Sequence, residues 1–240
     1  MTTHIVQAFD LELRAITEQV GDLGRRVGEQ VANAVRALDL SDALLADEVR
    51  AGDEALDRDA ERIENDAINL IARRQPLAVD LRHVMAALRI AANLERAGDL
   101  ASNIAKRAIA VMPSRLPEGM LVGLHRMVEL ALSQLRDSLE AFGAQDAALA
   151  QQVLAQDATL DELHTALFRD IVQHMSAPGA KTLDMVHLLF VAKNIERIGD
   201  HATNIAENVV YLVSGPDNVP DRAKNDESSL LATLLPREAE

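Results

Sequence analysis

The feature that most constrains this fold is a repeat within the chain. The segment NLERAGDLASNIA at residues 93–105 returns as NIERIGDHATNIA at residues 194–206, with nine of 13 positions identical. Farther upstream, DALLADEVRAGDEALD from Asp42 aligns with DAALAQQVLAQDATLD from Asp146. Self-similarity at a nearly fixed offset is the sequence signature of a duplicated structural unit. We therefore predict two similar halves, offset by 101 residues in the first match and 104 in the second.

The residue composition favours helices over sheets. Aromatic residues make up only 2% of the 240 residues, and apolar residues make up 48%. Alanine and leucine are good helix formers, whereas strands favour β-branched and aromatic residues. Apolar residues recur with a helical period in six stretches, at about residues 3–40, 41–74, 76–111, 120–142, 146–175 and 181–213. We predict an all-α protein.

Turn-forming residues separate the six helices and divide the chain. MPSRLPEG at residues 112–119, with two prolines and a glycine, is the predicted linker between the halves. Ser41 is the predicted N-cap of the second helix, and Pro76 separates the second helix from the third. The predicted units are a three-helix bundle at 1–112, a second three-helix bundle at 113–213 and a flexible polar tail at 214–240.

Charge and cysteine content exclude several classes of function. The chain has no cysteine, so it has no disulfides, thiolate metal sites or thiol nucleophiles. A net charge of −14 argues against a nucleic-acid partner, because binding to a phosphate backbone relies on Lys and Arg. No apolar run reaches the roughly 18–20 residues of a membrane-spanning helix, and the N-terminus lacks the pattern of a secretory signal. We expect a cytoplasmic protein without a membrane span and leave peripheral attachment to a membrane open.

The repeated segments carry acidic residues in pairs, spaced four residues apart. Residues at this spacing lie on one face of a helix, one turn apart. If the second and third helices of each half are antiparallel neighbours, two acidic pairs face each other in each half. The eight residues are Asp53, Asp57, Glu95 and Asp99 in the first half, and Asp157, Asp161, Glu196 and Asp200 in the second.

Like charges placed this close together repel each other, so each cluster requires a compensating charge. Carboxylate oxygens suit hard multivalent cations, and we predict divalent or trivalent metal ions, with Fe, Mn, Zn and Mg as candidates. Asn103 and Asn204, one turn farther along, can add amide oxygens or hydrogen bonds. Gly98 and Gly199 indicate close approach of a ligand or a neighbouring helix, because glycine costs about 1 kcal/mol in a helix interior.

Histidines are weaker candidates for metal ligands. His83, His164 and His187 each follow an aspartate by three residues, which is not the Glu-x-x-His pattern of di-iron carboxylate bundles. We expect these three to be surface or interhelix polar groups. His201, which replaces Leu100 beside the second motif, is a further candidate ligand.

Two alternatives to a metal-binding regulator remain open, a helical scaffold without metal and a metal-dependent enzyme. A single acidic pair is usually solvated, and Arg96 and Arg197 are placed to form ordinary ion pairs with the aspartates three residues farther on. The chain is then a helical scaffold whose acidic face binds a partner. The other alternative is a carboxylate-bridged multi-metal enzyme, an oxidase or a phosphohydrolase. No nucleophile or general base is evident, so we expect no catalytic residue and no enzyme.

The two NxERxGDxAxNIA motifs, the preceding QPLAVDLRHVMAALRIAANLER and the opening HIVQAFDLELRAI resemble the PhoU family over about residues 4–213. The resemblance implies two pseudo-symmetric three-helix bundles with metal clusters at the eight acidic positions. It also implies a negative regulator of the bacterial phosphate-starvation response. Such a protein couples the ATPase of the Pst phosphate transporter to a PhoR-type sensor kinase and limits phosphate uptake. We also expect the chain to form a homodimer.

Overall fold

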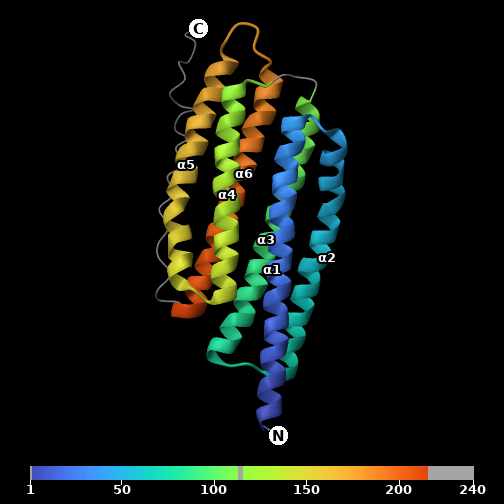
Figure 1. Ribbon diagram of the computed structural model, residues 1–240, viewed down its shortest axis with the longest axis vertical. Helices are drawn as coiled ribbons and strands as arrows, with labels where there is room; N and C mark the ends of the chain where they lie inside the picture. Colours follow the sequence, from blue (N-terminus) through green and yellow to red (C-terminus); the bar gives the residue numbers. More distant parts are fainter. Residues whose placement is uncertain (1, 113–115, 216–240) are drawn as a thin grey trace, which may run out of the picture.

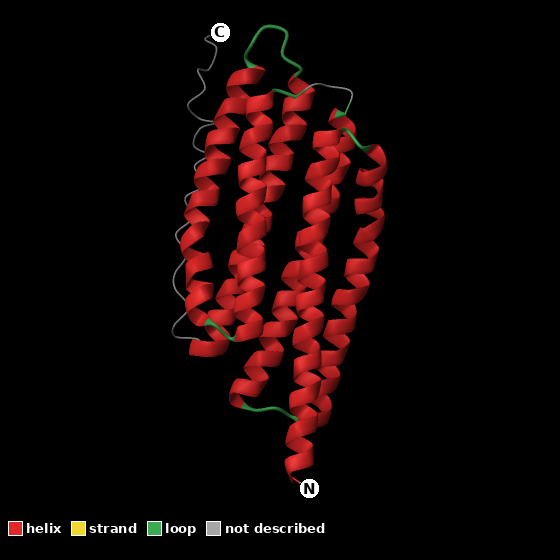
Figure 2. Ribbon diagram, in the orientation of Figure 1, coloured by secondary structure: helices red, strands yellow, loops and turns green. Residues whose placement is uncertain are grey.

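The computed structural model describes residues 2–112 and 116–215, with side chains from residue 8 onward, and consists there of helices and short loops. Figure 2 shows no strand in these two ranges. The prediction of an all-α fold is confirmed. The six helices are α1 (Thr2–Leu40), α2 (Ala43–Arg74), α3 (Ala78–Val111), α4 (Glu118–Ala144), α5 (Ala147–Met175) and α6 (Thr182–Ser214).

The helices form two three-helix bundles that lie side by side (Figure 1). Helices α1, α2 and α3 pack against one another, and α4, α5 and α6 do the same. Helix α3 also packs against α6, and α1 against α4, so the bundles share one apolar core. Among the described residues, no helix combines the length and the apolar character needed to cross a bilayer.

The segment between the bundles includes residues 113–115, which lie outside the described residues, so the predicted domain boundary there stays a prediction. Most of the predicted tail, residues 216–240, also lies outside them. Helix α4 runs two residues farther at each end than the predicted 120–142. Pro117 precedes its first residue, a place where proline is tolerated because no intrahelical N–H bond is lost there.

The first loop of each bundle has the same backbone conformation. Ser41 and Gln145 both have a φ of 52°, in the left-handed region. The next residues, Asp42 and Asp146, cap α2 and α5 by accepting hydrogen bonds from backbone N–H groups of the first turn. The prediction that Ser41 caps the second helix is therefore wrong by one residue. Ser41 forms the turn that precedes the cap. The Asp42 carboxylate then accepts a hydrogen bond over 3.0 Å from the N–H of Leu45, which has no partner within the helix.

His83 of α3 joins the two bundles and is the interhelix polar group that the sequence predicts. Its ring is buried edge-on against Phe142 of α4, with centroids 5.4 Å apart. Its Nδ1 lies 3.2 Å from the side-chain amide nitrogen of Gln145, and its Nε2 lies 3.2 Å from the hydroxyl of Thr17. That hydroxyl itself donates to the carbonyl of Leu13. These contacts suit a neutral ring that accepts at Nδ1 and donates at Nε2.

Burial lowers the pKa of His83 below its usual value near 6.5, and the charge of Asp80 offsets only part of that effect. As pH falls, the unfolded chain therefore binds the proton before the folded protein does. The stability that His83 contributes is present above about pH 6.5 and is lost as pH falls toward the folded-state pKa. We expect His83→Gln to flatten the pH dependence of the unfolding free energy by at most ~1.4 kcal/mol per pH unit.

Urea denaturation of both proteins between about pH 7 and pH 5 measures this difference. Asp53 and Glu95 have raised pKa values, so their contribution to the unfolding free energy increases as pH falls, opposite to that of His83. Because both proteins contain them, their effect cancels in the comparison. Equal slopes in the two proteins would contradict a buried neutral ring at this position.

Candidate metal centres

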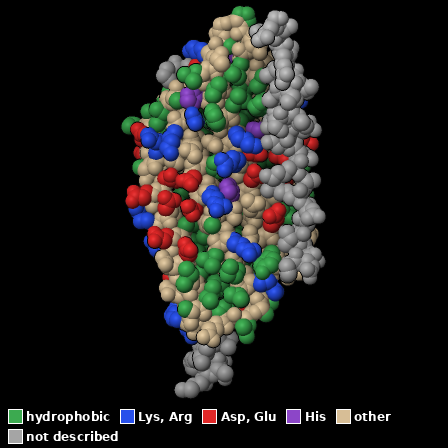
Figure 3. All heavy atoms as spheres, turned by 180° about the vertical axis from the view of Figure 1, so that it is seen from behind, with side chains coloured by type: hydrophobic (Ala, Val, Ile, Leu, Met, Phe, Trp, Pro, Cys, Tyr) green, Lys and Arg blue, Asp and Glu red, His purple; other side chains and the backbone are tan. Residues whose placement is uncertain are grey.

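The structure brings the four acidic residues of the first half together between α2 and α3. Asp53 and Asp57 lie on α2, and Glu95 and Asp99 lie on α3. The charges of Asp57 and Asp99 act on Glu95, and the charge of Asp99 acts on Asp53. Figure 3, which views the molecule from behind, shows carboxylates gathered at mid-height on the side of the first bundle. The predicted juxtaposition of the two pairs is confirmed in this half.

The surroundings of Asp53 and Glu95 disfavour the negatively charged form of these carboxylates. Burial above all, and then the neighbouring carboxylates, raise the pKa of Glu95 above its usual range. Burial and then the charge of Asp99 raise the pKa of Asp53, although a hydrogen bond with Ser102 acts in the opposite direction. The Oδ1 atom of Asp53 is buried and has no hydrogen-bond partner. A buried carboxylate oxygen of this kind is stabilised by a proton or a cation.

A hollow of about 410 Å³ opens beside the first cluster. Its lining includes the carboxylates of Asp57, Glu61, Glu64 and Glu95. Glu61 and Glu64 are not among the predicted site residues. They lie four and seven residues beyond Asp57 on the same face of α2, so helical spacing alone could have found them.

The second half places its acidic residues deeper. Asp157, Asp161 and Glu196 are each 5% exposed, and Asp200 is half-buried. Their four counterparts in the first half are half-buried or exposed. Burying a carboxylate costs free energy unless it is paired or hydrogen-bonded. The more deeply buried carboxylates of the second cluster therefore need a compensating partner more than those of the first. The second is an interior cluster and the first opens to the surface.

Two neighbours stabilise the buried carboxylates of the second cluster. The hydroxyl of Thr203 donates to Oδ1 of Asp157 over 3.1 Å, and Nζ of Lys193 lies 2.9 Å from Oε1 of Glu196. Ala92 stands in the first half where Lys193 stands in the second, and in the first cluster the charge of Lys106 instead acts to lower the pKa of Asp53. Lys193 is not among the predicted site residues, although its helical spacing of three from Glu196 could have indicated it.

Gly98 and Gly199 allow a leucine of the neighbouring helix to approach closely. A Cβ atom on Gly98 would lie 2.9 Å from Cδ1 of Leu56, and a Cβ atom on Gly199 would overlap Leu160. Leu56 and Leu160 are equivalent in the repeat. Of the two alternatives that the sequence left open, the structure therefore shows close approach of a helix.

Two asparagines of the motifs, Asn93 and Asn204, take part in the contact between bundles. Oδ1 of Asn93 lies 2.9 Å from Nδ1 of His201 and accepts a hydrogen bond from the amide of Asn204 over 3.3 Å. Asn103 is exposed, and its Oδ1 lies 3.4 Å from Nζ of Lys106. His201 and Asn204 thus join α6 to α3, and their suggested contribution to a metal site stays a prediction.

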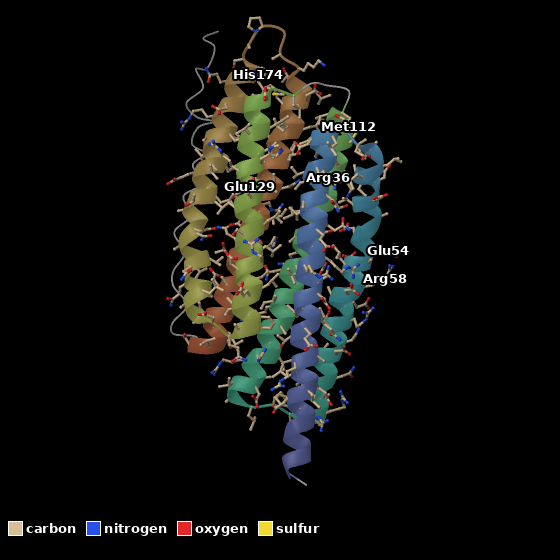
Figure 4. The ribbon with its side chains drawn as sticks, viewed as in Figure 1. Arg36, Glu54, Arg58, Met112, Glu129 and His174 are labelled. Carbon is tan, nitrogen blue, oxygen red and sulfur yellow. The ribbon has the colours of Figure 1, made fainter. Side chains whose placement is uncertain are left out.

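Ordinary helical ion pairs occur beside the clusters. Glu54 and Arg58 of α2 form one on the outer side of the first bundle, with 2.7 Å between Oε1 and the guanidinium (Figure 4). Within residues 8–112 and 116–215, Arg96 does not form an ion pair with Asp99, the aspartate three residues beyond it. The interpretation of the first motif as a simple Arg–Asp ion pair is therefore not supported, and that of the second motif stays a prediction.

The donor chemistry of the clusters fits a hard cation, although the side chains do not converge on one point. In the part of the chain described with side chains, no three Asp, Glu or His residues are grouped as metal ligands are. A cation would therefore draw the carboxylates together or bind partly through water, as Mg²⁺ commonly does. The ligand roles of the eight acidic residues stay predictions.

Two similar three-helix bundles, each with acidic residues at repeated positions of its second and third helices, define a class of duplicated all-α proteins. The family described as PhoU domain matches residues 20–108 and 124–209, one segment in each bundle. The chain belongs to the PhoU family.

Relatives and solved structures match nearly the whole chain. A Rhizobium meliloti protein is 44% identical over 96% of this chain and 98% of its own length. A Caulobacter vibrioides protein is 42% identical over 94% and 98%, and both are described as phosphate-specific transport system accessory protein PhoU homologs. The crystal structure of PhoU from Pseudomonas aeruginosa has a TM-score of 0.83 and 33% identity, over 87% of this chain and 100% of that one. The phosphate transport system regulatory protein PhoU from Streptococcus pneumoniae has a TM-score of 0.82 and 31% identity, over 89% and 99%.

Proposed function

We propose that this chain is an accessory protein of phosphate-specific transport that restrains the phosphate-starvation response when phosphate is ample. The observation that carries the proposal is the match of both bundles to one family, whose relatives span almost the full chain and are described as transport accessory proteins. We further propose that it couples the ATPase of a Pst-type transporter to a PhoR-type sensor kinase, as an adaptor without catalysis of its own. Both partners use ATP, which places the proposed site of action in the cytoplasm.

Metal binding at the two carboxylate clusters is part of the proposal. Its support is the buried Oδ1 of Asp53, which has no hydrogen-bond partner, and the repulsion that raises the pKa of both Asp53 and Glu95. A bound cation would supply the positive charge that these oxygens need. The residues of this chain would hold it between α2 and α3 in the first bundle, and between α5 and α6 in the second. Fe, Mn, Zn and Mg are the candidates.

Deleting the gene tests the biological role. We expect starvation genes to be switched on in cells that have ample phosphate, and phosphate uptake to continue unchecked, because the restraining adaptor is gone. A starvation-promoter reporter and uptake of labelled phosphate measure the two effects. A plasmid copy of the unaltered gene should reverse both. Deleted cells with a silent reporter and normal uptake would rule out the proposed role.

A further inference from the structure

Each bundle has, on its first helix, a glutamine whose amide oxygen is buried, and the repeat makes the two equivalent. Gln30 of α1 and Gln134 of α4 are 104 residues apart, the same offset that relates Asp53 to Asp157. Gln134 is 0% exposed, and neither its Oε1 nor its Nε2 has a hydrogen-bond partner. Oε1 of Gln30 is also buried without a partner. A buried amide oxygen without a hydrogen-bond partner is costly, so its presence at both positions points to a ligand.

The helical hairpins place both glutamines level with the carboxylate clusters. In two antiparallel helices, residues equally far from the connecting turn lie at the same height, because both helices rise equally per residue. Counted from the turn at Ser41 and Asp42, Gln30 is level with Asp53. The same count from the turn at Gln145 and Asp146 places Gln134 level with Asp157.

Packing agrees with this register. The side-chain amide of Gln30 packs against Gly52, the residue before Asp53. Oε1 of Gln134 would lie 3.1 Å from a Cβ atom on Gly199, the residue before Asp200. The glycine therefore leaves room for the amide at the centre of the second motif.

A chain of contacts links this place to the buried carboxylates of the second bundle. The hydroxyl of Thr203 lies 3.0 Å from the carbonyl oxygen of Gly199 and 3.1 Å from Oδ1 of Asp157. Gly199 thus has Gln134 of α4 on one side and is linked to Asp157 of α5 through Thr203. All three helices of the second bundle meet here.

We propose that Gln134, and Gln30 in the first bundle, each supply an amide oxygen from the first helix to the cation of the neighbouring carboxylate cluster. Each centre then draws donors from all three helices of its bundle rather than from two. Amide carbonyl oxygens are established ligands of hard cations, together with carboxylates. The inference rests on the metal binding in the proposed function, and it is most strongly supported at the buried second cluster.

The test measures Mn²⁺ affinity at the second cluster alone. Asp53→Asn and Asp99→Asn remove the first cluster, and Mn²⁺ binding is followed by competition with a fluorescent chelator. Gln134→Met keeps the length of the side chain and removes the amide. We expect it to weaken Mn²⁺ binding about 10- to 100-fold. In chelator it should raise the melting temperature, because the unpaired buried amide is gone.

Two further variants separate a ligand from a packing residue. Gln134→Glu restores an oxygen donor, so we expect it to recover Mn²⁺ binding while lowering the melting temperature in chelator. Ser138→Ala is the matched control, since Ser138 is also fully buried on α4 but its hydroxyl donates to the carbonyl of Leu135. It should leave Mn²⁺ affinity unchanged.

The outcomes distinguish this inference from the proposed function. If the Asp53→Asn, Asp99→Asn protein binds Mn²⁺ equally well with Gln134 and with Met at this position, the glutamine is not a ligand and the metal proposal stands. If neither that protein nor the unaltered chain binds Mn²⁺, both proposals are overturned.

Discussion

Purified protein carrying Asp99→Asn together with Asp200→Asn is expected to lose most of the Mn²⁺ that the unaltered chain binds. The charge of Asp99, like that of Asp57, raises the pKa of both Asp53 and Glu95, so Asp99 belongs to the first cluster. Asp200 holds the same motif position in the second. Asparagine keeps the shape of aspartate but removes the charge that attracts the cation. Elemental analysis after gel filtration gives the Mn²⁺ content per chain, and an unchanged content would rule out these residues as ligands.

The same chemistry predicts that the effect of Asp99→Asn on stability changes sign with metal. In chelator, the variant should be more stable than the unaltered chain, because Asp99 raises the pKa of Asp53 and Glu95 by repulsion. In Mn²⁺ at about 100 times its dissociation constant, bound metal stabilises the unaltered protein by ~2.7 kcal/mol per site. The variant forgoes that gain at the first cluster and should then be the less stable protein.

Glu54→Gln is the control for removal of a carboxylate. Glu54 neighbours Asp53 in sequence but forms an exposed ion pair with Arg58 on the outer side of α2 (Figure 4). Such pairs contribute about 0–1 kcal/mol, so its stability change should be small and have the same sign with and without Mn²⁺. A sign change in the control would show that the effect does not belong to the cluster.

The architecture could be predicted because its signals are local. Six apolar stretches of helical period and an internal repeat define six helices in two similar sets. The cap at Asp42 was missed because Ser41 is an equally good capping residue by type. Only the left-handed φ of Ser41, repeated at Gln145, decides which of the two adjacent residues makes the turn.

The candidate centres could be predicted only where their residues share a helix. The acidic pairs are visible because their spacing of four is a property of one helix. The depth of the second cluster and the position of Gln134 depend on how three helices pack, which no single stretch of sequence encodes. The hydroxyl residues Ser102 and Thr203 are intermediate cases. They occupy the same motif position, but their aspartate partners lie on another helix.

Gly199→Ala is expected to destabilise the protein by about 1–3 kcal/mol, although alanine is the better helix former by about 1 kcal/mol. The added methyl group would overlap Leu160 and lie 3.1 Å from Oε1 of Gln134, both on neighbouring helices. Urea denaturation measures the loss. Gly143→Ala on α4 is the control, because nothing lies within 4 Å of its Cβ position, and it should be neutral or mildly stabilising.

A double-mutant cycle assigns the loss to the contact between α5 and α6. Leu160→Ala alone should cost about 2–5 kcal/mol, because it opens a cavity in the core. In the double variant, Leu160→Ala removes the side chain that the new methyl group of Gly199→Ala would overlap. The stability loss of the double variant should therefore be smaller than the sum of the two single losses, by at least ~1 kcal/mol. Strict additivity would mean that Gly199 does not act through Leu160, and the close contact with Gln134 would then account for the loss.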